Sequence, residues 1–340
     1  MKFPENLGRS GLATAAFICI VIGSIKLSAD IITPFIFGVF LSVICMPIVN
    51  LLKKAKLPHS ISVLTALTFM LAILTIIGQF FYSSAKTLSS NMREYYEMFV
   101  EKISSLPYLN SIDELGISSG SITDMVDPSS FVSFGVSAIG IFSSLSASFL
   151  LVMLITAFML MEVDTIKGKV KSLSNGDKTV PDKIIDFTTS VRKYLLIKTI
   201  ISLITGFIIG VGLYLIGVPH FLLFAVIAFF LNYIPTIGSI AAAIPAVLLA
   251  FIVLDPTSAI AALALFAATN IILGSVVEPR FMGENLGLST LVVFSSLLIF
   301  GWIFGSAGML LAVPLTMIVK IAADKSKSWH WVSVAMGTGK

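Results

Sequence analysis

The sequence predicts an all-α integral membrane protein with about six transmembrane helices and two re-entrant helical hairpins that form an inverted repeat. Three observations lead to this prediction: a composition of 57% hydrophobic and 12% charged residues, several long apolar runs, and two longer runs with a helix-breaking centre. A soluble domain carries roughly 25% charged residues. With so few charges, lipid must replace water over most of the protein surface.

Six apolar runs are long enough to cross a membrane. A hydrocarbon core about 30 Å thick requires roughly 20 apolar residues in a helix, and backbone polar groups in lipid need partners within the helix. The expected spans are residues 11–29, 31–52, 60–85, 135–161, 194–217 and 257–277. Because another span follows the first almost at once, we expect a retained helix and no cleaved signal peptide. Cys19 and Cys45 fall in expected helices, where we expect packing roles and no disulfide.

The distribution of basic residues predicts the orientation. Lys and Arg gather after the second span and between the fourth and fifth spans, whereas segment 86–133 has three basic and seven acidic residues. The positive-inside rule therefore places both termini in the cytoplasm and segment 86–133 outside. Within it, Tyr95, Tyr96, Phe99 and Ile103 recur at helical spacing. This pattern predicts an amphipathic helix that either packs on the membrane face or serves as a lid or docking surface.

Two apolar runs do not fit simple crossings. His220–Ile252 has 33 residues without a charge, which would make a straight helix roughly 50 Å long. Half of that run is too short for a crossing, and Pro235 and Gly238 favour a break in the middle. Gly287–Lys320 is interrupted in the same way by the sequence GWIFGSAG, residues 301–308. Two re-entrant hairpins of opposite orientation account for both runs, and eight full crossings are the alternative.

The hairpin topology predicts a solute site near the middle of the membrane, where broken helices expose backbone groups. The predicted parts are a three-helix scaffold (1–85), an extracytoplasmic amphipathic segment (86–133), a fourth membrane helix with a basic cytoplasmic linker (134–193), a transport part with two helix-plus-hairpin units (194–323) and a cytoplasmic tail (324–340).

Candidate working residues lie in the expected transport part. Lys198 shares a helical face with Ser202 and Thr205, and it either has a functional role or reaches back to the cytoplasmic interface. Polar and aromatic groups at the two breaks either bind a hydroxyl-rich solute or cap the breaks. The candidate solute-binding residues are Lys198, Ser202, Thr205, Asn232, Tyr233, Pro235, Gly238, Trp302, Gly305 and Gly308. Glu278, Pro279 and Arg280 close the sixth span as a gate or as a site of ion coupling.

The sequence does not favour an enzyme. It contains no H-E-x-x-H metal pair, no G-x-S-x-G nucleophile turn and no G-x4-G-K-[ST] phosphate loop. We therefore expect no catalytic residue, no metal site and no cofactor. No basic patch suggests a nucleic-acid partner, so the expected partners are the lipid bilayer and a small-molecule solute.

Three blocks carry a family resemblance: NYIPTIGSIAAAIPA (232–246), EPRFMGENLGLS (278–289) and GWIFGSAGMLLAVP (301–314), together with a Y-x3-K-x3-S-x2-TG pattern from Tyr194. They resemble the autoinducer-2 exporter family of bacterial inner-membrane proteins. The resemblance implies a secondary transporter that exports a small polar signalling solute for quorum sensing, most directly autoinducer-2. It also implies a homo-oligomer, a pentamer, whose protomers transport by an elevator-like movement of the hairpin region.

One departure bears on the substrate. Many relatives have a His-Pro pair where this chain has Ser289-Thr290, and this resembles the subgroup that contains the autoinducer-2 exporter itself. Other members of the family are sodium or proton antiporters, so cation/proton antiport is one alternative. A passive channel or a membrane scaffold is another.

Overall fold

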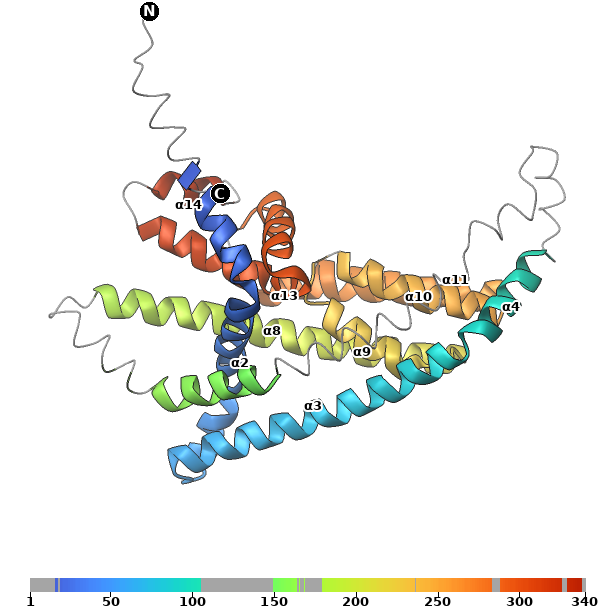
Figure 1. Ribbon diagram of the computed structural model, residues 1–340, viewed down its shortest axis with the longest axis horizontal. Coiled ribbons are helices and arrows are strands. Elements are labelled where there is room, and N and C mark those ends of the chain that lie inside the picture. Colours follow the sequence, from blue (N-terminus) through green and yellow to red (C-terminus); the bar gives the residue numbers. More distant parts are fainter. Residues whose placement is uncertain are drawn as a thin grey trace, which may run out of the picture. The chain divides into compact units, whose positions relative to one another are not determined.

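The computed structural model (Figure 1) describes residues 16–17, 19–104, 149–163, 165, 168, 179–235, 237–282, 288–325 and 329–337. The regular secondary structure in these ranges is helical throughout, as predicted. Five helices are long and apolar enough to cross a membrane: Ala29–Lys54, His59–Ser90, Thr189–Ile216, Pro256–Phe281 and Thr290–Asp324. Large apolar side chains such as Phe207 (71% exposed) and Leu215 (77% exposed) point outward. Lipid accommodates such a surface and water does not, so the protein is an all-α integral membrane protein.

The chain divides into two compact units. The first comprises Met1–Leu64, Phe149–Leu195 and Glu284–Lys340, and the second comprises Thr65–Ser148 and Leu196–Gly283. Two long helices, α3 (His59–Ser90) and α8 (Thr179–Ile216), contribute residues to both units. The predicted division into scaffold, linker and transport parts rests on functional roles, and it stays a prediction.

The helix bounds differ from the predicted spans mainly at their ends. Helix α3 continues to Ser90, and α8 begins at Thr179 inside the predicted basic linker. Pro181 does not prevent this start, because the first turn of a helix needs no donor from its backbone nitrogen. The predicted spans 11–29 and 135–161 lie partly outside the described residues, and the described part of the second is the short helix Phe149–Val163.

In the first unit, α2 (Ala29–Lys54) packs against the helix Phe149–Val163. The Oγ1 atom of Thr156 donates a hydrogen bond to the carbonyl oxygen of Gly38 at 3.2 Å. The same unit contains α13 (Thr290–Lys325) and α14 (His330–Ala335). Neither cysteine forms a disulfide within the described part of the chain; Cys45 is buried, in agreement with a packing role, whereas Cys19 is exposed.

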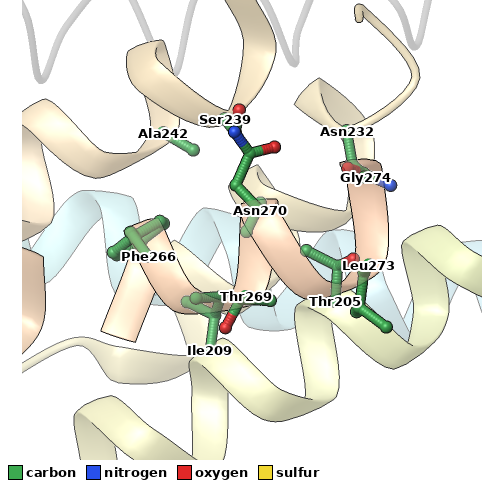
Figure 2. A pocket seen from close by; sticks show the side chains of 11 residues that line it. Thr205, Ile209, Asn232, Ser239, Ala242, Phe266, Thr269, Asn270, Leu273 and Gly274 are labelled. Atoms are coloured by element: carbon green, nitrogen blue, oxygen red, sulfur yellow. The ribbon is translucent and has the colours of Figure 1, made fainter. Parts of the chain in front are cut away.

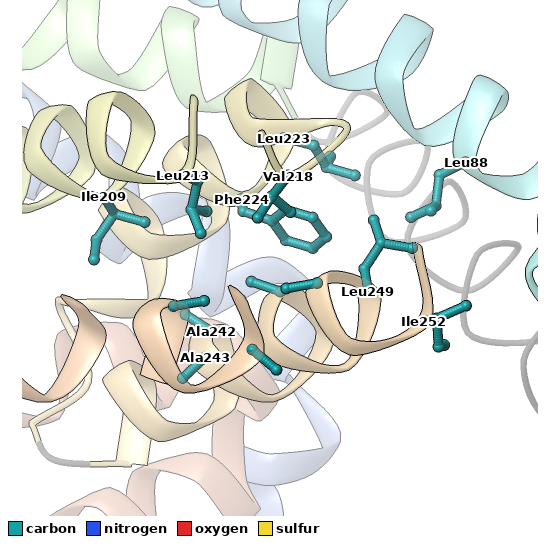
Figure 3. Packing of buried hydrophobic residues seen from close by; sticks show 14 of the residues in the cluster. Leu88, Ile209, Leu213, Val218, Leu223, Phe224, Ala242, Ala243, Leu249 and Ile252 are labelled. Carbon is teal, nitrogen blue, oxygen red and sulfur yellow. The ribbon is translucent and has the colours of Figure 1, made fainter. Parts of the chain in front are cut away.

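The second unit has one apolar core, shown in Figure 3. Side chains from α3, α4 (Met92–Ser104), α8, α9 (Phe221–Leu231), α10 (Ile237–Val253) and α11 (Pro256–Thr269) meet in it. Small residues such as Ala242 and Ala246, both fully buried, let α10 approach its neighbours closely. The chain then continues through η2 (Asn270–Val277) into α12 (Glu278–Met282).

The first predicted break is present. Helix α9 ends at Leu231 and α10 begins at Ile237, so the arms have 11 and 17 residues and measure about 16 Å and 25 Å. Neither arm reaches the roughly 30 Å of a hydrocarbon core. A side chain at Gly238 would overlap the carbonyl oxygen of Leu231, so the return of the chain requires a glycine there.

The second predicted break is also present, at Gly305 within α13. The backbone there has φ 66° and ψ −150°, far from helical values. L-residues rarely adopt positive φ, and glycine does so without a steric penalty. Both long apolar runs are therefore interrupted helices, as predicted, and the placement of their arms in a membrane stays a prediction.

Candidate functional site

A buried polar face on α8 forms the base of the candidate site. Lys198, Ser202 and Thr205 are 2%, 0% and 7% exposed. Their spacing of four and three residues places them on one side of the helix, and the structure shows that this side faces the interior of the second unit. Three polar side chains at this depth require partners or a ligand.

Lys198 forms an ion pair with Glu278. Its ammonium nitrogen lies 2.7 Å from one carboxylate oxygen of Glu278 and 2.8 Å from the other. The two side chains are 2% and 15% exposed. Burial of either charge alone would be costly, and the close contact compensates both. The sequence places these residues 80 positions apart in separate candidate sets, and the fold brings them together.

The polar residues at the first helix break bind α8. The Nδ2 atom of Asn232 donates to Oγ of Ser202 at 2.9 Å, and the hydroxyl of Tyr233 donates to Oγ1 of Thr199 at 2.8 Å. These two bonds join the broken segment to the same stretch of helix that holds Lys198. Both side chains are thus engaged by polar groups of α8 in this conformation, and their predicted role in solute binding stays a prediction.

A π-helix lies between α11 and α12. Residues Asn270–Val277 form it, and it ends directly before Glu278. π-helical turns are rare and frequently occur at functional sites. The wider turn leaves the amide of Asn270 beside Gly274, where an added Cβ would lie 3.1 Å from the Asn270 Oδ1 atom. Asn270 is the lone amide of the apolar run 257–277, and the Thr269-Asn270 pair is the sequence signal that could have placed this turn in the site.

These elements surround a small cavity (Figure 2). Its polar lining comes from α8, the helix break, α10, the end of α11 and the π-helix, through Thr205, Asn232, Ser239, Thr269 and Asn270. None of its eleven lining residues is charged. The space open to the centre of a water molecule is about 10 Å³. One water molecule needs about that much, so the cavity is closed to larger solutes in this conformation.

One polar atom in the cavity wall stands out. The Oγ1 atom of Thr205 is buried and has no hydrogen-bond partner among the residues that the structure describes. A buried hydroxyl without a partner costs roughly 1–3 kcal/mol. A water molecule or a bound solute in the cavity would satisfy it.

The remaining candidates have different surroundings. Pro235 and Gly238 shape the first break, while Pro279 and Arg280 are exposed at the end of the sixth span. The carboxylate of Glu278 is thus bound by Lys198, and Arg280 is not its partner in the buried pair.

The candidates at the second break belong to the first unit. Gly305 and Gly308 lie in α13, where a side chain at Gly308 would overlap the carbonyl oxygen of Phe300. Trp302 is 57% exposed, and the ammonium of Lys26 lies 3.6 Å from the centre of its ring. This cation–π contact occupies one face of the ring of this candidate solute-binding residue.

Comparison with known proteins identifies a family and several relatives that match nearly the whole chain. A family model for AI-2E family transporters matches residues 15–328. A putative transport protein of Haemophilus influenzae is 35% identical over 327 residues, which cover 94% of each chain. The AI-2 transport protein TqsA of Escherichia coli is 32% identical over 319 residues, which cover 94% of this chain and 93% of TqsA. The putative transport protein YhhT of Escherichia coli is 31% identical over 341 residues, 99% of this chain and 97% of YhhT.

The match extends from the first described helix to the end of α13, and it includes all the residues of the candidate site. The relatives are named as transport proteins, and the family is one of transporters rather than enzymes. The chain therefore belongs to the AI-2E transporter family.

Proposed function

We propose that this protein is a secondary transporter of the bacterial inner membrane that exports a small polar signalling solute, most directly autoinducer-2. The observation that carries the proposal is the cavity with neutral polar walls and an unsatisfied Thr205 hydroxyl at its surface. The name of TqsA, an AI-2 transport protein, supports the choice of solute.

The chemistry of the cavity suits a neutral solute. Hydroxyl and amide groups from Thr205, Thr269, Asn232 and Asn270 can donate and accept hydrogen bonds. A charged solute would find no counter-charge among the lining side chains and would pay a large desolvation cost. A small molecule rich in hydroxyl groups meets these walls without that cost.

Transport requires the cavity to open. Its volume of about 10 Å³ is far below the roughly 300–1,000 Å³ of ligand pockets. Opening separates the broken segment from α8, which breaks the bond between Asn232 and Ser202. An elevator-like movement of two re-entrant hairpins would provide this change, in a homo-pentamer with both termini in the cytoplasm. The solute then passes beside the broken helices.

Cation/proton antiport is the second candidate, because Glu278 is a largely buried carboxylate. Lys198 already balances its charge, and the described residues contain no group of three or more His, Cys, Asp or Glu side chains that could hold a metal ion. A passive channel is a third candidate, which differs from a transporter in that its flux does not saturate with solute.

The test is uptake of labelled autoinducer-2 into inside-out vesicles, with and without an imposed proton gradient. We compare the wild type with Thr205→Val, which removes the hydroxyl and keeps the shape. Since this hydroxyl has no partner among the described residues, its removal breaks no hydrogen bond within the protein, and the variant should be at least as stable as the wild type. Its KM should rise roughly tenfold, the equivalent of one hydrogen bond to the solute.

Thr75→Val is the matched control, because the Thr75 hydroxyl bonds to the carbonyl oxygen of Leu71 in its own helix and does not line the cavity. It should transport like the wild type. Uptake no greater than in vesicles without the protein would refute autoinducer-2 as the solute. Uptake that never saturates would favour a channel, and sodium/proton exchange in place of uptake would favour the antiporter.

A further inference from the structure

Helix α4 lies at the open end of the first hairpin, away from the helix break. Its residues Met92, Tyr95 and Phe99 are all less than 10% exposed. They belong to the same apolar core as Leu249 and Ile252 near the end of α10. Figure 3 shows these last two residues beside Leu88, at the end of α3 that leads into α4. The amphipathic helix predicted from the sequence therefore packs on the hairpin itself.

Lys102 binds the last turn of α10. Its ammonium donates to the carbonyl oxygens of Phe251 at 2.8 Å, Ile252 at 3.3 Å and Leu254 at 2.6 Å. The last carbonyls of a helix have no partner within it, and a cation there also meets the negative end of the helix dipole. The three donors of one ammonium match the three acceptors. A single side chain of α4 thus completes the C-terminus of the second hairpin arm.

Tyr95 binds the start of the first arm. Its hydroxyl lies 3.2 Å from the Nε2 atom of His220, which directly precedes α9. The rings meet edge to face at 6.4 Å. His220 has a positive φ of 56°, so the chain turns sharply at this contact.

Both ends of the hairpin are therefore held by one face of α4. Tyr95, Phe99 and Lys102 follow one another at helical spacing of four and three residues. The partners of Tyr95 and Lys102, at positions 220 and 251–254, are the two ends of the hairpin. We infer that α4 is a clamp that closes the base of the hairpin α9–α10 and moves with it as a single body during transport. Tyr95 and Lys102 are its positioning residues. The shared movement rests on the proposed transport function, whereas the clamp rests only on the contacts of α4 with the two ends of the hairpin.

Hydrogen exchange tests the clamp without transport. Lys102→Met keeps most of the side-chain length and removes all three donors. The variant loses the charge-assisted bonds to the end of α10. Amide exchange should therefore become roughly tenfold faster or more in three segments at once: α4, the end of α10 and the start of α9. Lys102→Arg should retain protection. Arg93→Met is the control, since Arg93 is 90% exposed on the same helix. Faster exchange at the end of α10 alone would overturn the clamp.

Cross-linking tests the shared movement. Cysteines replace Tyr95 and His220 in a protein with Cys19→Ser and Cys45→Ala, and a short, reducible bifunctional thiol reagent joins them. If α4 travels with the hairpin, the joined protein should transport autoinducer-2 at the rate of the unjoined one. Transport that stops on cross-linking and returns on reduction would overturn the inference. If the wild type carries no autoinducer-2, the proposed solute fails, and the exchange experiment still decides the clamp.

Discussion

The buried ion pair between Lys198 and Glu278 gives the sharpest test of the site. Lys198→Met removes the ammonium and keeps a side chain of similar length. The Glu278 carboxylate, 15% exposed, then loses both contacts of 2.7 and 2.8 Å to its counter-ion. Removing one partner of a buried pair costs about 3–5 kcal/mol, because an uncompensated charge stays behind.

The double variant Lys198→Met/Glu278→Met separates this cost from a loss of packing. It removes both charges and fills their space with apolar groups, a change that is often neutral or stabilising in buried pairs. We therefore expect the double variant to be more stable than either single variant. Independent effects of the two substitutions would add, so a double variant that is more stable than either single variant identifies an interaction between the two positions.

The assay is thermal unfolding of the purified protein in one detergent at one pH, followed by intrinsic fluorescence. At roughly 2 °C per kcal/mol for a chain of this size, the melting temperature of Lys198→Met should fall by about 6–10 °C. Lys193→Met is the control, because Lys193 is exposed on the same helix, and surface changes stay within about 0.5 kcal/mol. The reasoning would be refuted if the melting temperature of the double variant fell by as much as the two single variants combined. It would also be refuted if Lys198→Met had the melting temperature of the wild type.

Two further predictions concern the backbone and pH. Gly305→Ala places a side chain at φ 66° and ψ −150°, a region that is essentially restricted to glycine, and should cost about 1–3 kcal/mol. Gly301→Ala, whose new methyl has the flexible Met309 side chain as its nearest neighbour, should cost less. Equal melting temperatures would contradict the role of positive φ. Burial lowers the pKa of His220 from its ordinary value of 6.5. Its neutral form is thus favoured in the folded protein, and the stability that it contributes is present above pH 6.5 and lost as the pH falls through the lowered pKa. The melting temperature should therefore drop as the pH falls below 6.5, and it should drop less in His220→Gln. An identical drop in both proteins would exclude His220 as the cause.

Local sequence was sufficient for the membrane fold class and for the places where helices break. Apolar runs without charges must be helical in lipid, and Pro235, Gly238 and Gly305 impose their backbone preferences on immediate neighbours. The structure confirms both interruptions. The polar face with Lys198, Ser202 and Thr205 also followed from helical spacing alone, since it depends only on residues within three turns.

The partners of these residues required the tertiary structure. Lys198 and Glu278 are 80 residues apart, and Lys102 and Leu254 are 152 apart, so no local pattern connects them. The π-helix at Asn270–Val277 was not apparent from the sequence either, because the packing around a helix decides whether one turn widens. The sequence by itself determined which segments are helical, where they break and which polar residues lie in them. Only the fold decided that an ion pair joins α8 to α12, that two hydrogen bonds join α8 to the first helix break, and that α4 holds the base of the hairpin. Such contacts form between segments that meet only when the chain is packed.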